Sequence, residues 1–365
     1  MPRVLTVFGT RPEIIRLSLT IAALDRACDH HVVYTGQNAD PRLSDVFFDE
    51  LAVRPPDSRL HIGGSRFADQ MGPLFSGLAD IIARVRPTTM VVLGDTNSGL
   101  SAVLAARMGV PVCHLEAGNR SDDARSPEEV NRRVIDHVST VLMPYTHHSR
   151  RRLEAEGIDR RRVHVIGNPI FDVLQAFAAP IAASAVAASL GVEAGAFCLL
   201  TLHRAETVDV PARLASAIHA ASAAAGRRDW PLVFPVHPRT LDRMRQAGMP
   251  ATMPGVILAP PLGFFDFVWL ERHARAVFSD SGTVQEECAI LGTPNIVLRE
   301  FTERPETIES GASVLAGVTG DSVESALAQL LARTSTPAPP ADYTLTGVAE
   351  RVTKLVLEAG SDSPS

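Results

Sequence analysis

A polar turn near the end of the chain combines hydroxyl side chains, a glycine and nearby carboxylates. It reads DSGT at 280–283, directly after an apolar run, and Glu287 stands one helical turn further on. Such a turn at a helix start presents hydroxyls and backbone N–H groups that lack partners inside the helix, and the helix dipole favours anions there. We therefore expect Ser281, Gly282 and Thr283 to bind phosphate oxygens. Glu287 lies too far along the helix to cap it, and its carboxylate could accept hydrogen bonds from two neighbouring hydroxyls, such as those of a ribose.

A fork-shaped cation follows in the ERPE segment at 303–306. The guanidinium group of Arg304 can bind phosphate oxygens through two parallel hydrogen bonds. A phosphate-binding turn, an acceptor for ribose hydroxyls and this arginine together predict a site for a sugar nucleotide.

Two further arginines lie beside the first predicted helix start, in GTRPEIIR at 9–16. The segment lacks the GxGxxG spacing of dinucleotide-binding turns, so we expect no nicotinamide cofactor. Arg11 and Arg16 are spaced so that one or both could face an anion; the alternative is that they are surface arginines beside a helix start.

Three carboxylates follow apolar segments or open helices in the first half of the chain. Asp95, in GDTNS, could act on a ligand or could cap the next helix. Glu116 ends an apolar run just before Gly118, where a merely solvated glutamate is rare. Glu128 and Arg132 are four residues apart and share one helix face, so they form either a surface ion pair or an oriented carboxylate that faces a ligand.

Two histidines end apolar runs in the second half, and an arginine follows each of them closely, in HR at 203–204 and HPR at 237–239. We expect His203 to reach a ligand, whereas a structural role is the favoured interpretation of His237. We expect no metal site, because the paired histidines lack the spacing of helical ligands and no cluster of Cys and His accompanies them.

Short apolar segments alternate with helical segments, as is typical of parallel sheets covered on both faces. Strands are expected at 4–8, 31–35, 89–93, 110–116, 141–145, 163–166, 197–202, 232–236, 256–259, 276–279, 295–298 and 313–315. Helices of the first half are expected at 12–28, 67–86, 98–108, 127–139 and 146–156. Ligands of such sheets bind beyond the carboxyl ends of the strands, and the candidate residues fall in those turns.

The pattern restarts after an alanine-rich helical stretch at 176–189. We therefore expect two Rossmann-like α/β domains with a ligand cleft between them. The first domain is expected over 1–175 and the second over 176–345, and a last helix at 346–360 would pack on the first domain.

The composition is that of a folded protein, with 45% hydrophobic and 21% charged residues among 365. A net charge of −6 argues against a nucleic-acid partner. Four widely spaced cysteines without a CxxC pair indicate buried thiols in a reducing compartment. The chain start does not resemble a secretion signal and no apolar stretch has membrane-helix length, so we expect a cytoplasmic protein with no membrane partner.

A series of motifs resembles the non-hydrolysing UDP-N-acetylglucosamine 2-epimerases over about residues 3–318: GTRPEIIRL, GDTNS, HLEAGNR, SPEEVNRR, TLHRAET, PVHPRT, SDSGTVQEE and ERPE. The resemblance implies a glycosyltransferase-B-like fold and a homodimer, with no metal or cofactor. It also implies interconversion of UDP-GlcNAc and UDP-ManNAc, in which UDP is eliminated to give 2-acetamidoglucal and then adds back.

The resemblance further assigns roles to the matching positions. The carboxylates near the sugar, among them the acid and the base, are Asp95, Glu116 and Glu128. The groups that stabilise the diphosphate are His203, Arg11, Arg16, Ser281, Gly282 and Thr283. Glu287 would bind the ribose, Arg304 would lie near the phosphates or the sugar, and Leu262 and Phe267 would line the uracil pocket. Which carboxylate takes the proton stays open.

Alternatives remain for the substrate and for the reaction. Arg16 stands where the family usually has Lys, and Thr283 where it usually has Gly. Together with EAGNR, PLGF and IIRL, these departures resemble a sub-branch that acts on UDP-activated 6-deoxy-L-acetamido sugars. A glycosyltransferase of the same fold is a second class, although three carboxylates exceed what a transferase needs. A hydrolysing epimerase also stays open.

Overall fold

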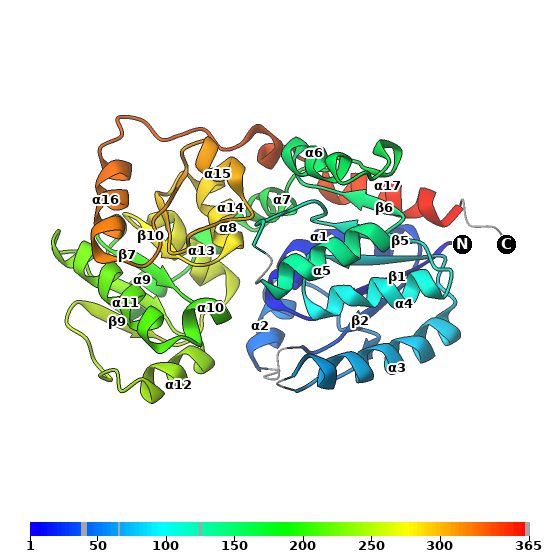
Figure 1. Ribbon diagram of the computed structural model, residues 1–365, viewed down its shortest axis with the longest axis horizontal. Helices are drawn as coiled ribbons and strands as arrows, with labels where there is room; N and C mark the ends of the chain where they lie inside the picture. Colours follow the sequence, from blue (N-terminus) through cyan, green and yellow to red (C-terminus); the bar gives the residue numbers. More distant parts are fainter. Residues whose placement is uncertain (38–41, 65, 124–125, 362–365) are drawn as a thin grey trace. The chain divides into compact units, whose positions relative to one another are not determined.

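The structure is a computed structural model that describes residues 1–37, 42–64, 66–123 and 126–361, and these residues form two compact α/β units (Figure 1). Unit 1 comprises Met1–Ala176 with Asp342–Ser365, and unit 2 comprises Phe177–Ala341. Each unit holds a parallel six-stranded sheet with helices on both faces.

The sheet of unit 1 has the strand order β3-β2-β1-β4-β5-β6, which is the order of a dinucleotide-binding α/β sheet. Its strands are β1 (Arg3–Phe8), β2 (Asp29–Tyr34), β3 (Ser58–Arg59), β4 (Thr89–Leu93), β5 (Val112–Leu115) and β6 (Val141–Met143). The central strands β1 and β4 are buried along almost their whole length, so apolar residues occupy both faces of the sheet.

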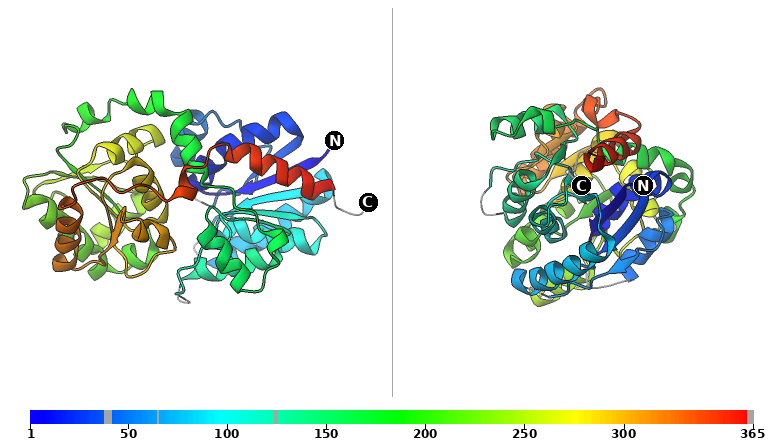
Figure 2. Two further views of the ribbon diagram at one scale, coloured as in Figure 1. Left: turned by 90° about the horizontal axis from the view of Figure 1, so that it is seen from above. Right: turned by 90° about the vertical axis from the view of Figure 1, so that its right-hand side faces the viewer.

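Helices cover both faces of this sheet. They are α1 (Arg11–Ala27), α2 (Arg42–Glu50), α3 (Phe67–Val85), α4 (Ser101–Arg107), α5 (Pro127–Val138), α6 (His147–Ala155), α7 (Pro169–Ala176) and α17 (Val348–Ser361). The chain returns to unit 1 with α17, which packs against α1, α7 and β4, and Figure 2 shows it (red) beside α1 (blue). Val352 and Val356 of α17 are fully buried in this contact.

The sheet of unit 2 repeats the same topology, in the order β12-β11-β10-β7-β8-β9. Its strands are β7 (Cys198–Thr201), β8 (Leu232–Pro235), β9 (Val256–Ala259), β10 (Val277–Ser279), β11 (Asn295–Val297) and β12 (Ser313–Leu315). Its helices are α8 (Ala178–Ala182), α9 (Val186–Leu190), α10 (Ala205–Val208), α11 (Pro211–Gly226), α12 (Pro238–Gln246), α13 (Phe264–His273), α14 (Gly282–Leu291), α15 (Pro305–Glu309) and α16 (Gly320–Leu331). One apolar cluster lies under α11 and α16, and a second lies under α9, α13 and α14.

The predicted α/β class with parallel sheets is confirmed, but several elements differ from the expectation. The predicted strand at 163–166 is wrong, because only Val163 makes a bridge, to Leu142. The helix expected at 98–108 begins as a 3-10 turn, Asn97–Leu100, before α4. The alanine-rich stretch forms two short helices, α8 and α9, and no expectation covered α2 or the two-residue strand β3.

The four cysteines are buried and none forms a disulfide. Among the described residues no single helix is long and apolar enough to cross a membrane. One pair of helices joined at a bend, Pro169–Ala176 with Ala178–Leu190, has the length and the apolar composition of a membrane span, and nothing beyond length and composition supports that role.

Candidate active site

Two predicted residues of unit 1, Asp95 and Glu116, lie in turns that follow the neighbouring strands β4 and β5, and helix α1 begins just after the turn that follows β1. The other predicted residues of unit 1 lie in helices, Arg11 and Arg16 in α1 and Glu128 and Arg132 in α5. Strand β1 leads into Gly9 and Thr10, β4 into Gly94 and Asp95, and β5 into Glu116. Parallel strands end at one edge of a sheet, so the three turns are neighbours there.

A buried carboxylate joins two of these turns. Glu13 is 1% exposed, and its Oε2 accepts hydrogen bonds from the backbone N–H groups of Gly9 (3.1 Å) and Thr10 (2.8 Å) and from the Thr10 hydroxyl (2.7 Å). Its Oε1 accepts from the hydroxyl of Thr96 at 3.1 Å, next to Asp95. Burial raises the pKa of Glu13 from 4.5 to about 7, although all of these hydrogen bonds act in the opposite direction.

Of the two alternatives for Glu128 and Arg132, the surface ion pair is wrong, because Arg132 is buried. Arg132 is 3% exposed and binds Asp95 at 2.5 Å and Glu129 at 3.2 Å. Glu128 is half-buried and accepts from the Ser126 hydroxyl at 2.7 Å. A surface ion pair between positions 128 and 132 is therefore excluded, and Arg132 holds the Asp95 carboxylate instead.

Glu116 adopts a left-handed backbone conformation with φ of 67°. This region costs a residue that carries a Cβ roughly 1–2 kcal/mol, so the surrounding structure must hold it there. The side chain is 9% exposed, and its carboxylate accepts from Asn119 Nδ2 at 3.3 Å and from the Tyr145 hydroxyl at 3.4 Å. A Cβ built on Gly94 would lie 3.8 Å from Glu116 Oε2, which places this carboxylate beside the Gly94–Asp95 turn.

The two candidate arginines of unit 1 differ in exposure. Arg16 is 1% exposed, which excludes a surface arginine at this position. Arg11 is half-buried over the ring of Phe47, 5.8 Å from its centroid, and burial lowers the pKa of its guanidinium group.

In unit 2 a second buried carboxylate holds the turn after β7. Asp280 is fully buried and accepts hydrogen bonds from the backbone N–H groups of His203 (3.1 Å) and Arg204 (3.1 Å). Nδ1 of the His203 ring lies 3.3 Å from Oδ1 of the buried Asp280, so this carboxylate orients the ring. The side chain is 46% exposed and reaches solvent.

The predicted phosphate-binding turn opens α14. Ser281 caps the helix by accepting from Val284 N, and its hydroxyl lies 2.9 Å from that of Thr283. A Cβ built on Gly282 would lie 2.7 Å from Glu303 Oε1, so a side chain at this position would push into a buried carboxylate. A glycine therefore lets the backbone approach Glu303 closely.

Buried charges support this turn. Glu303 is 2% exposed and pairs with Arg204 at 2.5 Å and with Arg299 at 2.7 Å. Arg304 donates to Glu286, a residue of α14 that is fully buried. Helix α14 is buried at every position from Val284 to Ala289, including the carboxylates Glu286 and Glu287.

The remaining candidates of unit 2 lie in or beside three helices: Glu287 in α14, Leu262 and Phe267 at the start of α13, and His237 at the start of α12. Glu287 is 4% exposed. Burial, with the charges of Glu271 and Glu287, raises the pKa of the nearby Cys288 thiol well above its ordinary value. Leu262 and Phe267 are partly buried against the apolar cluster under α13. His237 caps α12, its ring accepting from Arg239 N at 3.3 Å.

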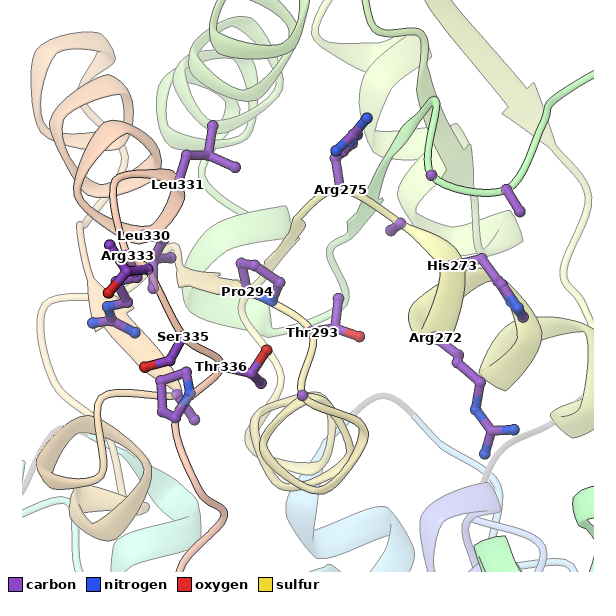
Figure 3. Close-up of a pocket in the computed structure, with 17 residues that line it drawn as sticks. Arg272, His273, Arg275, Thr293, Pro294, Leu330, Leu331, Arg333, Ser335 and Thr336 are labelled. Carbon is purple, nitrogen blue, oxygen red and sulfur yellow. The ribbon is translucent and has the colours of Figure 1, made fainter.

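A cavity of about 610 Å³ lies at the opposite edge of the unit 2 sheet (Figure 3). It is lined by residues that precede β10 and β11, such as Arg275 and Pro294, and by none of the candidate residues. The guanidinium groups of Arg272, Arg275 and Arg333 point in different directions there. Because α13, α14 and α16 end at this edge, their dipoles disfavour an anion.

The structure thus brings the candidates together in two sets, one at the carboxyl edge of each sheet. It also shows buried partners that the sequence interpretation missed: Glu13, Glu129, Asp136, Asp280, Glu286, Arg299 and Glu303. Within the described residues no group of three or more His, Cys, Asp or Glu is placed to hold a metal ion.

Comparison with known proteins gives consistent matches. The family model for UDP-N-acetylglucosamine 2-epimerase matches residues 22–357. A UDP-N-acetylglucosamine 2-epimerase of Methanocaldococcus jannaschii is 37% identical over 320 residues, which cover 85% of this chain and 87% of that protein. A UDP-2,3-diacetamido-2,3-dideoxy-D-glucuronate 2-epimerase of Pseudomonas aeruginosa is 35% identical over 332 residues, which cover 90% and 92%. The crystal structure of the Methanocaldococcus jannaschii UDP-GlcNAc 2-epimerase with UDP-GlcNAc and UDP has a TM-score of 0.91 at 33% identity, covering 98% of this chain and 100% of that chain.

Two Rossmann-like sheets with polar turns at their carboxyl edges define an enzyme of the glycosyltransferase-B-like fold class, which confirms the expected fold. The chain belongs to the UDP-N-acetylglucosamine 2-epimerase family, a family of isomerases that act on carbohydrates. The resemblance stated from the motifs is confirmed.

The raised pKa of Glu13 predicts a pH-dependent stability. The native state binds a proton with a pKa of about 7 and the unfolded state with the ordinary value of 4.5. Between these values the native state holds more protons, so Glu13 contributes stability at pH 5 that is lost as the pH rises through 7.

We expect the unfolding free energy of the native protein, relative to that of Glu13→Gln, to fall by on the order of 2 kcal/mol between pH 5 and pH 8. Urea unfolding of both proteins at the two pH values measures this difference. Any constant offset from the amide cancels, and a difference that does not change with pH would contradict the assignment.

Proposed function

We propose that this chain interconverts UDP-GlcNAc and UDP-ManNAc by eliminating UDP from C1 with loss of the C2 proton, and then adding UDP back to C1 while the proton returns to the opposite face of C2. Membership of the epimerase family supports the proposal, and so does the sequence match to relatives that carry this name. The observation that carries it is the set of half-buried or buried carboxylates at the unit 1 edge, Asp95, Glu116 and Glu128.

The chemistry requires such carboxylates. The C2 proton of the sugar has no neighbouring carbonyl to acidify it, so C1–O cleavage leads and the bonding electrons leave with UDP. The resulting cationic C1 acidifies C2, a base takes the proton, and a C1=C2 double bond forms in 2-acetamidoglucal. Re-addition of UDP and return of the proton to the other face complete the reaction. Negative groups near C1 and donors at the diphosphate stabilise this charge separation.

The residues of unit 1 serve the sugar in this proposal. Asp95, Glu116 and Glu128 provide the acid, the base and negative charge near C1. Arg132 orients Asp95 through their 2.5 Å ion pair. Arg11 and Arg16 supply positive charge for the departing diphosphate.

The residues of unit 2 serve the nucleotide. The Ser281–Gly282–Thr283 turn offers hydroxyls and the N-terminus of α14 to the diphosphate. His203, exposed at its ring and fixed at its backbone by Asp280, donates to the same group. Glu287 binds the ribose, Arg304 lies near the phosphates, and Leu262 with Phe267 contacts the uracil.

The proposal includes a cytoplasmic homodimer without metal or cofactor. Phe67 of α3 and Val130 and Val134 of α5 are exposed apolar side chains that a second copy would cover in this proposal. Light scattering at the mass of one chain, 39.1 kDa, would argue against the dimer.

Incubation with UDP-GlcNAc in D2O tests the reaction. We expect NMR to show UDP-ManNAc and deuterium at C2, since the proton is exchanged with solvent at the glycal stage. Release of free ManNAc would indicate a hydrolysing epimerase, and loss of sugar only on addition of an acceptor would indicate a glycosyltransferase. Turnover of a UDP-activated 6-deoxy-L-acetamido sugar but not of UDP-GlcNAc would move the substrate to that alternative.

Neutral variants of the carboxylates test their roles. Asp95→Asn, Glu116→Gln and Glu128→Gln should each lower turnover by roughly 10²–10⁴-fold, because each removes a charge or a proton carrier. Affinity for UDP, measured by calorimetry, should change little, since none of the three carboxylates is a proposed ligand of the nucleotide. Glu154→Gln, an exposed change on α6, is the control. Near-normal turnover in all three variants would remove these assignments.

A further inference from the structure

A histidine beneath the unit 1 turns has both ring nitrogens engaged. His114 of β5 is fully buried, with Nδ1 2.8 Å from Asp136 Oδ1 and Nε2 2.9 Å from the backbone oxygen of Gly94. A carboxylate and a carbonyl are both acceptors, so the ring contacts an acceptor at each of its nitrogens.

The second oxygen of Asp136 holds the neighbouring turn. Oδ2 accepts from the backbone N–H of Gly118 at 3.1 Å and pairs with Arg120 at 2.8 Å. Burial alone would raise the pKa of Asp136, but its contacts with His114 and Arg120 outweigh burial and lower it, so the group is a carboxylate. Arg120 is fixed in turn by two 2.7 Å bonds to Glu156.

The two ends of this chain of bonds are the backbones of the carboxylate-bearing turns. Gly94 directly precedes Asp95, and Gly118 follows Glu116 by two residues. The two glycines and Glu116 all have positive φ, at 69°, 82° and 67°. A Cβ on Gly118 would lie 2.5 Å from the backbone oxygen of Ser149, so this turn has little room to move.

We propose that His114 and Asp136 are positioning residues of the proposed epimerase reaction. Together they form a clamp that sets the spacing of the Asp95 and Glu116 turns. Both are fully buried, so they act through the backbone of the turns and do not touch the sugar. The inference rests on the proposed function of Asp95 and Glu116, because proton removal and return need both carboxylates in register with C1 and C2.

Three variants separate the two halves of the clamp. An asparagine at 114 can place its amide N–H near the position of Nδ1 and loses the bond to Gly94, whereas a glutamine reaches the Nε2 position and loses the bond to Asp136. Asp136→Asn keeps the size of the side chain. An amide N–H₂ at the Oδ2 position cannot accept from the Gly118 N–H and Arg120, which both donate there.

We expect His114→Asn, His114→Gln and Asp136→Asn each to lower kcat by about 10²-fold, the usual effect of misplacing reacting groups by about 1 Å. KM for the UDP-sugar and Kd for UDP should stay within about threefold, because the nucleotide groups are untouched. A merely structural role would change the amount of folded protein and leave kcat per folded molecule unchanged.

A matched pair elsewhere in unit 1 provides the control. His30 of β2 has a similar pair of contacts, with Nδ1 2.7 Å from Asp25, whose side chain is 27% exposed, and Nε2 2.8 Å from the Thr6 hydroxyl; the His30 side chain itself is 1% exposed. His30→Gln therefore removes the His–Asp contact of a buried imidazole without touching the turns. We expect it to lower thermal stability and leave kcat within about twofold.

A kcat within twofold of wild type in the position-114 variants, or an equal loss in His30→Gln, overturns the proposal. Crystal structures of the variants give a readout that does not need activity, since the clamp predicts that Gly118 shifts relative to Gly94 in Asp136→Asn. If the wild-type protein fails to epimerise, the proposed function fails. In that case an unshifted Gly118 still overturns the clamp, and a shifted one retains it as a structural device.

Discussion

Backbone N–H groups in the turns at the carboxyl edges of both sheets bond to carboxylates buried beneath them. Glu13 accepts from the first turn of unit 1, Asp136 from the turn after β5, and Asp280 from the turn after β7 in unit 2. A buried polar or charged group without partners is costly, so each carboxyl group is stable only while its turn keeps this shape. The arrangement fixes the backbone next to Asp95, Glu116 and His203. Asp95 is half-buried, Glu116 is buried beside the Gly94 turn, and His203 is exposed.

Much of the fold could be predicted because buried parallel strands are apolar runs. The strand predicted at 89–93 is β4, with the same bounds. The failures have physical causes. Strand β3 has only two residues, too few for any periodicity, and the apolar residues at 163–166 bridge the sheet only at Val163, because hydrophobicity reports burial and not hydrogen bonding. Pro111 and Glu116 shorten the strand expected at 110–116, since the first cannot donate and the second leaves the extended conformation.

The sequence predicted which turns carry the candidate site residues. It did not predict the buried charged residues that hold these turns. Strand-end position identified Asp95, Glu116 and His203, but spacing alone offered Glu128 as one alternative for the partner of Arg132. Helix α5 buries Glu129, Asn131, Arg132, Ile135 and Asp136. The steps of three and four residues from 129 to 132 and from 132 to 136 mark one helix face, and this periodicity carried the signal for Glu129 and Asp136. Asp280 was described as part of a phosphate-binding turn, while its carboxylate points back to the turn after β7. Sequence shows which groups are present, and only packing shows which of them face inward.

The central claim is that buried carboxylates hold these turns in place before any ligand binds. Residue-resolved hydrogen exchange on the deuterated protein without nucleotide, followed by NMR, tests it directly. The account predicts protection like that of sheet amides at the backbone N–H groups bonded to these carboxylates: Gly9, Thr10, Gly118, His203 and Arg204. Exchange of these amides at the rate of an unstructured loop, with the strands still protected, would contradict it.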